Sequence, residues 1–344
     1  MHFDQTNLSD SCLQLHELLD ANLLLPQEYQ GRFTNHLPMS LHALHSLGAS
    51  PDRLHEFFIF YGRRFQNKKH ANAMQTSPLP TENWLRLRGQ ENTFPSLLAY
   101  FNGIVASHGM EGALRFALPD LMPGVAAAAF HGVIRTAHAF QAAHAGELAA
   151  ALSYWACRWQ HLMEPPVAHP MIGFDNWARL LVAQDPGRYN DGELISTRMS
   201  EASRSNAYLG LAGALLPAAS LEVRIAELAK LAVNCYVARP SFTTLHLVTG
   251  FRALRTLLPW IQDSETSQAT VVNCFVAAFI VARGSTTDIE PVVVPKPQSW
   301  AEVIKAAISS NDEHVVKLVH ACRDEAQWYG ERLYLTAATQ ATIT

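Results

Sequence analysis

Apolar residues along this chain recur every three or four positions, the spacing that places them on one face of an α-helix. The clearest stripe follows Ser50-Pro51, where a capping side chain precedes a proline suited to the first helical turn. Its apolar members are Leu54, Phe57, Phe58, Tyr61 and Phe65. The same spacing predicts helices over residues 121–140, 147–159, 201–216, 221–237, 241–258 and 267–282. We therefore expect an all-α fold.

The segments between these helices are short. Pro217, Pro240 and Pro259 separate some of the helices, and loops are expected over 67–83, 164–173, 185–191 and 284–297. Strand candidates are few, and the segment 291–295 is short and broken by proline. Because there is no long linker and no repeat at a fixed period, we expect residues 1–344 to form one large multi-helix domain.

Two capping boxes are expected late in the chain. Ser299 with Glu302 has the spacing that lets a hydroxyl and a carboxylate close the first turn of a helix reciprocally. Ser310 with Glu313 has the same spacing and is predicted to open the last long helix.

Composition excludes several classes of protein. Hydrophobic residues make up 49% of the 344 residues and charged residues 16%, which suits a deep core rather than a disordered chain. Lys and Arg number 26 against 30 Asp and Glu, and no basic tract suggests nucleic acid. No uninterrupted apolar run reaches the roughly 18 residues of a membrane span, and no secretory signal opens the chain. We expect a cytoplasmic protein without nucleic-acid or membrane partners; the sequence indicates no oligomeric state.

Common catalytic motifs are missing as well. The five cysteines form no CxxC pair, which argues against a zinc knuckle or a disulfide framework. There is no GxGxxG, no GxxxxGK[ST], no HExxH and no GxSxG, so no dinucleotide-binding, phosphate-loop, zincin or serine-hydrolase signature is present. No glutamate is followed by histidine three positions later, which argues against a ferritin-like di-iron bundle.

Histidine is the unusual residue, with 16 copies. His36 lies just before Pro38, near a predicted helix N-terminus, and His131 and His246 lie in strongly apolar helices. His314 and Lys317 are three positions apart and share a helical face. A single histidine on an apolar face is more often a hydrogen-bonded core residue than a metal ligand. Several neutral imidazoles on buried helices suit iron or zinc, and a site without cysteine and with open positions suits Fe(II) and O2 better than structural zinc.

Lys317 is surrounded in sequence by valines and leucine, so burial is expected. A buried lysine is costly unless it is paired or neutral. A salt bridge to Asp312, Glu313 or Asp324 is the structural alternative to a role in chemistry.

Four segments resemble the questin oxidase family. They are Asn-His-Leu-Pro-Met at 35–39 followed by Leu44 and Leu47-Gly48, Ala-Phe-His-Gly-Val-Ile-Arg at 129–135 with Tyr154-Trp155-Ala156, the stretch around His246, and Asp-Glu-His-Val-Val-Lys at 312–317. The resemblance spans about residues 35–329. It implies an enzyme of secondary metabolism that opens a ring of an anthraquinone or related polycyclic aromatic compound with O2.

The resemblance also implies a site. It assigns iron, Fe(II), to His36, His131, His246 and His314, with Lys317 as a carboxylated ligand. The carbamate would supply an anionic oxygen, for which the sequence offers no other obvious carboxylate. His320 is an alternative to His314, and His42, His45 and His138 are further candidates. Arg135 is the candidate catalytic residue, as a stabiliser of an oxyanion, with pairing to an acid as the alternative.

Two other functions stay open at this point. One is an NADPH-dependent Baeyer-Villiger-type monooxygenase without metal, although no nicotinamide motif is present and NADPH could serve as an external reductant. The other is a non-enzymatic helical binding protein. The substrate does not follow from the resemblance, because Phe57, Phe58, Tyr154, Trp155 and Trp159 are more typical of a core than of a pocket wall.

Overall fold

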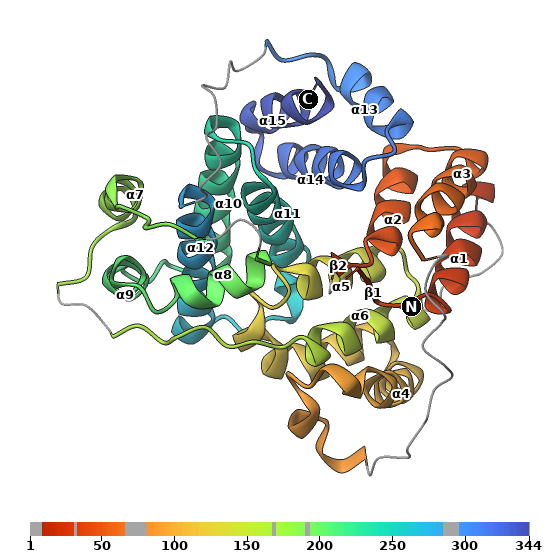
Figure 1. Cartoon of the computed structure of the whole chain (residues 1–344), viewed down its shortest axis with the longest axis horizontal. Helices are drawn as coiled ribbons and strands as arrows, with labels where there is room; N and C mark the ends of the chain where they lie inside the picture. The colour runs from red at the N-terminus through yellow and green to blue at the C-terminus, as the bar shows by residue number, and fades with distance from the viewer. Residues whose placement is uncertain are drawn as a thin grey trace.

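The computed structural model describes residues 9–30, 33–65, 81–166, 170–189, 193–284 and 296–343, without the side chains of 81–83. It is 74% helical, with 15 α-helices and a two-stranded antiparallel sheet in the described part (Figure 1), which confirms the all-α class. The sheet pairs β1 (Glu28–Tyr29) with β2 (Phe33–Thr34).

The N-terminal helices pack around a hydrophobic cluster of their own. They are α1 (Asp10–Leu23), α2 (Leu37–Leu47) and α3 (Pro51–Gly62), and the cluster includes Leu15, Leu41 and Phe57. Ser50 caps α3 as expected, because its hydroxyl accepts a hydrogen bond from the Arg53 amide.

A larger hydrophobic cluster contains side chains from α2 through α15. Its middle helices are α4 (Phe94–Leu121), α5 (His131–Gln141), α6 (Ala145–Cys157), α7 (Phe174–Ala183), α8 (Ile195–Ala202), α9 (Asn206–Ala212), α10 (Leu221–Ala238), α11 (Phe242–Leu257) and α12 (Glu265–Arg283). The C-terminal helices are α13 (Trp300–Ser309), α14 (Glu313–Tyr329) and α15 (Leu333–Ile343). Short 3-10 segments occur at Arg63–Phe65, Thr81–Leu87, Glu91–Thr93, Met122–Gly124 and Leu258–Trp260.

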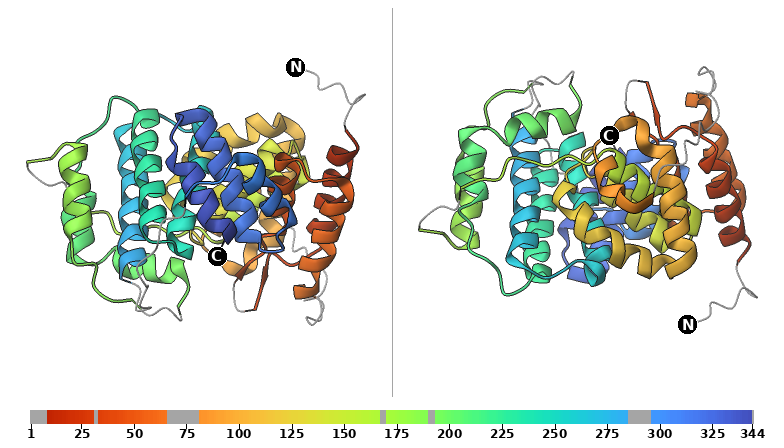
Figure 2. Two further views of the ribbon diagram at one scale, coloured as in Figure 1. Left: turned by 90° about the horizontal axis from the view of Figure 1, so that it is seen from above. Right: turned by 90° about the horizontal axis from the view of Figure 1, so that it is seen from below.

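Four helices far apart in the sequence form a closed ring of contacts. Helix α2 packs on α5 and α14, and α11 packs on the same two helices. Figure 1 shows these four near the centre of the molecule, and Figure 2 shows α1 and α7 at opposite ends. The ring brings four separate parts of the chain around one interior space.

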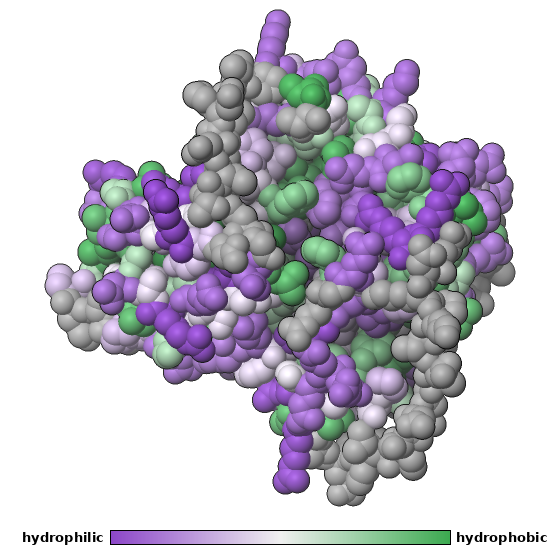
Figure 3. Space-filling model, viewed as in Figure 1, coloured by the Kyte–Doolittle hydropathy of each residue, from purple (hydrophilic) through white to green (hydrophobic). Residues whose placement is uncertain are grey.

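Helix α12 is long and apolar enough by composition to cross a membrane, but 67% of its most apolar window is buried inside the protein. It packs on α8, α9, α10 and α11, which is the environment of a core helix. On the face drawn in Figure 3, hydrophilic residues predominate and hydrophobic residues are scattered among them.

The predicted helices over 147–159, 221–237, 241–258 and 267–282 correspond to α6, α10, α11 and α12, and the capping box of Ser299 with Glu302 is present. The predicted helix over 201–216 is wrong, because the chain turns after α8 and Ser205 caps a separate helix, α9. The strand candidate at 291–295, and most of the loops at 67–83 and 284–297, lie outside the described residues.

The predicted helix over 121–140 is also wrong. Ala128, Ala129 and Phe130 have φ angles of 47°, 56° and 67°, so the backbone is left-handed just before α5 begins at His131. Each non-glycine residue in this region costs about 1–2 kcal/mol. Such strain persists where the surrounding structure holds it, and it is concentrated at functional sites.

The predicted capping box of Ser310 with Glu313 does not form. Asp312 caps α14 instead, and its carboxylate accepts a hydrogen bond from the His314 amide at 2.7 Å. Glu313 is thereby free to turn its carboxylate away from the helix end, toward the interior of the four-helix ring.

Candidate metal centre

Histidines from all four helices of the ring converge on one place. His36 precedes α2, His131 opens α5, His246 lies in α11 and His314 lies in the first turn of α14. The Nε2 atoms of His36 and His131 are 2.7 Å apart, and those of His131 and His246 are 3.2 Å apart. The His36 and His314 ring centroids are 4.9 Å apart. We call these four residues the cavity cluster.

The left-handed turn fixes how His131 is presented. It places the Ala128 carbonyl against His131 Nδ1, so this nitrogen must carry the proton and donate it. The Nε2 atom of His131 is then an unprotonated acceptor that points into the cluster. Two glycines allow this packing: a Cβ on Gly132 would lie 2.5 Å from the Trp155 side chain, and one on Gly250 would lie 3.0 Å from Phe130.

His246 is oriented in the same way by its own helix. Its Nδ1 donates to the Phe242 carbonyl at 2.5 Å, which leaves its Nε2 unprotonated. The two nitrogens of His131 and His246 that face each other at 3.2 Å are therefore both acceptors. A neutral pair in this geometry has no proton to share, so a cation is the group that fits between them.

The contacts of His36 also indicate that a cation fits at the cluster. Its backbone amide donates to Tyr61 Oη at 3.0 Å, and its Nδ1 lies 3.6 Å from Glu313 Oε1. A neutral His36 has one proton, and that proton cannot serve both the Glu313 carboxylate and the acceptor Nε2 of His131. With Nδ1–H directed at Glu313, the third Nε2 atom is also a free ligand.

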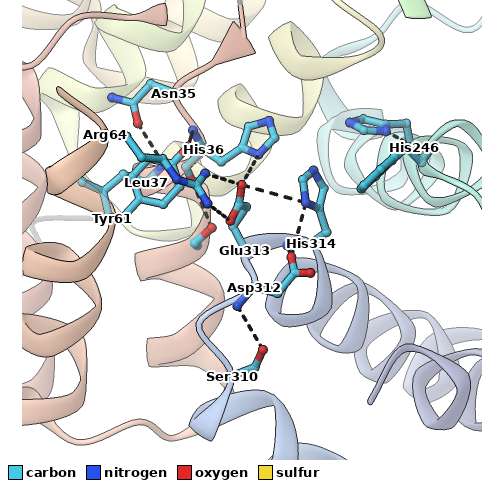
Figure 4. Close-up of polar contacts among 12 residues, drawn as sticks. Asn35, His36, Leu37, Tyr61, Arg64, His246, Ser310, Asp312, Glu313 and His314 are labelled. Atoms are coloured by element: carbon cyan, nitrogen blue, oxygen red, sulfur yellow. Dashed lines mark hydrogen bonds and ion pairs between the residues drawn. The ribbon is translucent and has the colours of Figure 1, made fainter. Parts of the chain in front are cut away.

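Glu313 is the carboxylate of the site, and Arg64 holds it. Arg64 donates to its two oxygens at 2.5 and 2.9 Å, and Glu313 is only 4% exposed. Figure 4 shows the Glu313 carboxylate between Arg64, His36 and His314. His36, Glu313 and His314 each offer a ligand atom within 4.8 Å of the others. Burial raises the pKa of Glu313, but the Arg64 hydrogen bonds and the His314 charge outweigh it, so the net pKa is lowered and the group is a carboxylate at neutral pH.

Burial keeps the imidazoles of His36, His131 and His246 neutral. It lowers the pKa of His246 to about 3, with the Lys317 charge as the next cause. Burial, followed by the charge of Lys317, also lowers the pKa of His36 well below its ordinary value. For His131 the causes after burial are His36 and His246. Neutral imidazole is the form that binds a metal.

Lys317 lies on α14 below the cluster and is 2% exposed. Its charge acts on His36, His131 and His246, so it is close to all three. Burial lowers the pKa of Lys317 to about 8, against the opposing effect of Glu313 and Asp312. Among the described residues it makes no salt bridge: Glu313 pairs with Arg64, and Asp324 pairs with Arg252 and Arg255.

The cavity cluster opens onto a cavity of 680 Å³, a size typical of small-molecule sites. All four cluster histidines line it, as do the aromatic residues Tyr29, Phe33, Trp159 and Phe242. Charged side chains at its wall include Arg158 and its two ion-pair partners, Glu28 and Glu91. The cavity thus combines a histidine-rich wall with aromatic and charged side chains.

A family model described as questin oxidase-like matches residues 33–322. The chain belongs to the questin oxidase-like family. The match covers all of the cavity cluster and Lys317, and it agrees with the resemblance seen in the sequence motifs. A search of curated proteins finds no match to this chain. Family membership identifies an oxidoreductase of secondary metabolism that acts on a small molecule.

In this questin oxidase-like chain, the structure separates the candidate histidines into two groups. His42, His138 and His320 do not line the cavity but lie together deeper in the protein. His314, rather than His320, is the late histidine of the cavity cluster. His45 belongs to neither group, because its Nδ1 contacts Ser11 Oγ at 3.0 Å.

Arg135, the candidate catalytic residue, is placed away from the cavity. Its guanidinium pairs with Glu147, with Nε to Oε1 at 2.5 Å and Nη2 to Oε2 at 3.0 Å, and it also donates to Gln27. The side chain is fully buried and does not line the cavity. These contacts match the alternative in which Arg135 pairs with an acidic residue instead of stabilising an oxyanion.

Sequence reasoning missed Glu313 and Arg64. The sequence pattern places Glu313 in a capping box with Ser310 and therefore predicts no carboxylate beside the histidines. The signal available was Asp312, which is itself a strong capping residue and makes a second cap unnecessary. No sequence pattern pointed to Arg64, because it lies 249 positions from Glu313 along the chain.

The donor set fits a non-haem metal ion. It contains three inward-facing imidazole nitrogens, a fourth imidazole and a buried carboxylate, and it includes no cysteine. The buried Nδ1 of His36 has no hydrogen-bond partner within 3.5 Å in the described part of the chain. Such donors favour iron, zinc or another borderline divalent ion.

Proposed function

We propose that this protein is a non-haem Fe(II)-dependent oxygenase that uses O2 to cleave a ring of an anthraquinone-like or other polycyclic aromatic substrate. The observation that carries the proposal is the pair of unprotonated Nε2 atoms of His131 and His246, 3.2 Å apart at the cavity wall. A histidine-dominated site that faces a substrate-sized cavity suits Fe(II) and O2.

The proposed ligands are His36, His131, His246, His314 and a carboxylated Lys317. Iron bound there would supply the one-electron chemistry that O2 requires. Glu313 Oε1 faces Nδ1 of His36 at 3.6 Å, so a proton held on that nitrogen would leave Nε2 of the ring free for the metal, an arrangement that outer carboxylates provide at many histidine sites. Arg64 and Tyr61 hold this arrangement, through Glu313 and through the His36 amide.

Carboxylation of Lys317 needs an uncharged amine. The Nζ lone pair attacks the carbon of CO2, a C–N bond forms, and one proton leaves the nitrogen to solvent, which yields an anionic carbamate. Burial of Lys317 favours the neutral amine. The absence of a salt-bridge partner among the described residues leaves the nitrogen available.

The cavity walls bind and orient the substrate. Tyr29, Trp159 and Phe242 present aromatic faces on which a flat polycyclic compound can stack. The histidine wall then lies along one edge of the substrate, where a phenolic oxygen of the ring system would approach the cluster.

The test is metal analysis of freshly purified protein together with O2 uptake on a hydroxyanthraquinone. Near-stoichiometric iron is expected in the wild type and its loss in His131→Ala, with O2 uptake lost in parallel. His108→Ala is the matched control, because His108 is exposed on α4 and does not line the cavity.

Two outcomes contradict the proposal. Activity that survives chelation and consumes NADPH stoichiometrically would favour the metal-free monooxygenase. If no metal binds after anaerobic reconstitution with Fe(II) and bicarbonate, the protein is not an iron oxygenase.

A further inference from the structure

A second group of buried histidines lies deeper in the protein, and we call it the inner cluster. It consists of His42 on α2, His138 on α5 and His320 on α14, which are 5%, 4% and 6% exposed. The Nδ1 atoms of His42 and His138 are 2.8 Å apart. The ring centroid of His320 lies 5.5 Å from that of His42 and 5.2 Å from that of His138.

The inner cluster repeats the cavity cluster along the same helices. His42 follows His36, His138 follows His131 and His320 follows His314, each by six or seven residues. At 3.6 residues per turn this is about two helical turns. The helix packing that assembles the first set of imidazoles therefore assembles the second set as well.

The inner imidazoles are in the form that binds metal. Burial, followed by the charge of Arg252, lowers the pKa of His42 to about 3. Burial is also the first cause for His138 and His320, whose pKa values fall well below the ordinary value. The buried Nδ1 of His320 has no hydrogen-bond partner in the described part of the chain, which costs free energy unless a ligand satisfies it.

The charges around the inner cluster come from α11 and α14. Arg252 pairs with Asp324 at 2.6 Å, and Arg255 pairs with Asp324 at 2.9 Å and with Glu325 at 2.5 Å. Arg323 donates to the Ser46 carbonyl at 3.1 Å. Asp324 and Glu325 thus lie opposite Arg252 and Arg255, although burial raises the pKa of Glu325 to about 7.

We propose that the inner cluster is a second metal site, in which His42, His138 and His320 bind a divalent ion of the zinc or iron class. Three imidazoles without cysteine suit such an ion. Because none of the three lines the cavity, the ion has a structural role: it ties α2, α5 and α14 together beneath the cavity cluster.

Lys317 lies between the two sites. Its charge acts on His138 of the inner cluster as well as on His36, His131 and His246 of the cavity cluster. When carboxylated, Lys317 would carry a negative charge that acts on both clusters. This last point rests on the proposed function, whereas the inner site itself does not.

The test counts metal ions bound by the full-length protein. Metal-free protein is titrated with Co(II), whose visible spectrum reports histidine ligation, and bound metal is counted by mass spectrometry. The wild type is expected to bind two equivalents. The double variant His42→Ala/His320→Ala is expected to bind one, and His131→Ala is expected to lose the other. His45→Ala, on α2 but in neither cluster, is the matched control and keeps both.

Stability provides the second readout. Zn(II) should raise the Tm of His131→Ala through the inner site and should raise that of the inner double variant through the cavity site. His320→Gln, which keeps a polar side chain of similar size, replaces the double variant if that variant does not fold, and it should bind the inner ion at least tenfold more weakly.

The outcomes separate the two proposals. A wild type that binds one equivalent, retained in the inner variants and lost in His131→Ala, overturns the inner site and leaves the cavity site standing. One equivalent lost in the inner variants but retained in His131→Ala supports the inner site and removes the iron proposal.

Discussion

The cavity cluster and the inner cluster share α2, α5 and α14 and the same residue type, but only the cavity cluster adds a histidine from α11, and their surroundings differ. In the cavity cluster, backbone carbonyls fix the protons of His131 and His246 on Nδ1, and the Glu313 carboxylate faces His36. In the inner cluster, the imidazoles of His42 and His138 contact each other, and the Ser46 hydroxyl lies 3.3 Å from His42 Nε2.

The difference shows what makes a histidine reactive. Burial is the first cause that lowers the pKa values of His36, His131 and His246 and of the three inner imidazoles, so burial does not distinguish the two clusters. Three features distinguish them: carbonyl acceptors that turn nitrogen lone pairs inward, a carboxylate at the edge, and a cavity that brings a substrate to one set only. The cavity cluster is thereby suited to chemistry and the inner cluster to holding helices together.

The largest effect is expected from substitution of Lys317, which lies between His314 of the cavity cluster and His320 of the inner cluster on α14. Lys317→Ala should lower the metal affinity of the cavity cluster by more than about 10–100-fold, the range seen when only outer-shell partners are removed. Reconstitution of the wild type with Fe(II) should need bicarbonate, and that of the variant should not respond to it. Metal content and activity that are unchanged in Lys317→Ala would remove the carbamate and leave a histidine site.

The next effect compares one arginine from each region. Arg64→Gln removes the arginine partner of the Glu313 carboxylate, whose side chain is only 6% exposed, so it should lower the free energy of unfolding by about 3–5 kcal/mol. Arg252→Gln should cost less, about 1–3 kcal/mol, because its partner Asp324 is 29% exposed at its side chain and keeps its ion pair with Arg255. Urea unfolding of the metal-free proteins measures both, and a larger loss for Arg252→Gln would show that burial of the arginine, rather than of its acidic partner, sets the cost.

A smaller, pH-dependent effect is expected beneath the inner cluster. Burial raises the pKa of Glu325 to about 7 from an ordinary value of 4.5, in spite of the Arg255 ion pair. Between these values the folded protein holds more protons than the unfolded chain, so the contribution of Glu325 to stability is present below pH 4.5 and is lost as the pH rises through 7.

The comparison of wild type with Glu325→Gln isolates this effect. The difference in their free energies of unfolding should become less favourable to the wild type from about pH 4.5 to pH 7, whereas exposed Glu222→Gln should show no such trend. A difference that is flat with pH would mean that Arg255 keeps Glu325 ionised.

The smallest effect is expected at the left-handed turn, a feature that the inner cluster lacks. Ala129→Gly should relieve about 1–2 kcal/mol of backbone strain and lose about 0.5–1 kcal/mol to chain entropy, for a net gain of about 0.5–1 kcal/mol. Ala106→Gly, in the exposed face of α4, should destabilise instead. Thermal unfolding of both variants measures the contrast, and a loss in Ala129→Gly would show that the turn is not strained.

Much of the architecture could be predicted because it depends on local pattern. The apolar spacing of α10, α11 and α12 and the capping box of Ser299 with Glu302 are properties of adjacent residues, and these predictions agree with the structure. The errors arose where packing overrides propensity. The alanines at 126–129 favour a helix, but Pro123-Gly124 before them is a turn signal, and the fit of Phe130 against Gly250 accompanies a left-handed turn.

In the candidate site, too, some features could be predicted from the sequence and others depended on packing. The sequence motifs point to His36, His131, His246, His314 and Lys317 as a set, and the structure brings the four histidines together at one cavity wall. The separation of the remaining histidines into an inner cluster was not predicted, since which of two turns of a helix faces the cavity depends on how four helices pack.

The sequence by itself determined the all-α class and the family, because helical periodicity and motifs are properties of neighbouring residues. Only the tertiary structure decided which histidine nitrogens face inward, that Arg64 holds Glu313 beside them, and that Arg135 is committed to Glu147. The physical reason is distance along the chain. The position of a histidine proton and the formation of an ion pair both depend on the neighbouring group in space, and folding can bring that group from as far as 249 residues away, as with Arg64 and Glu313.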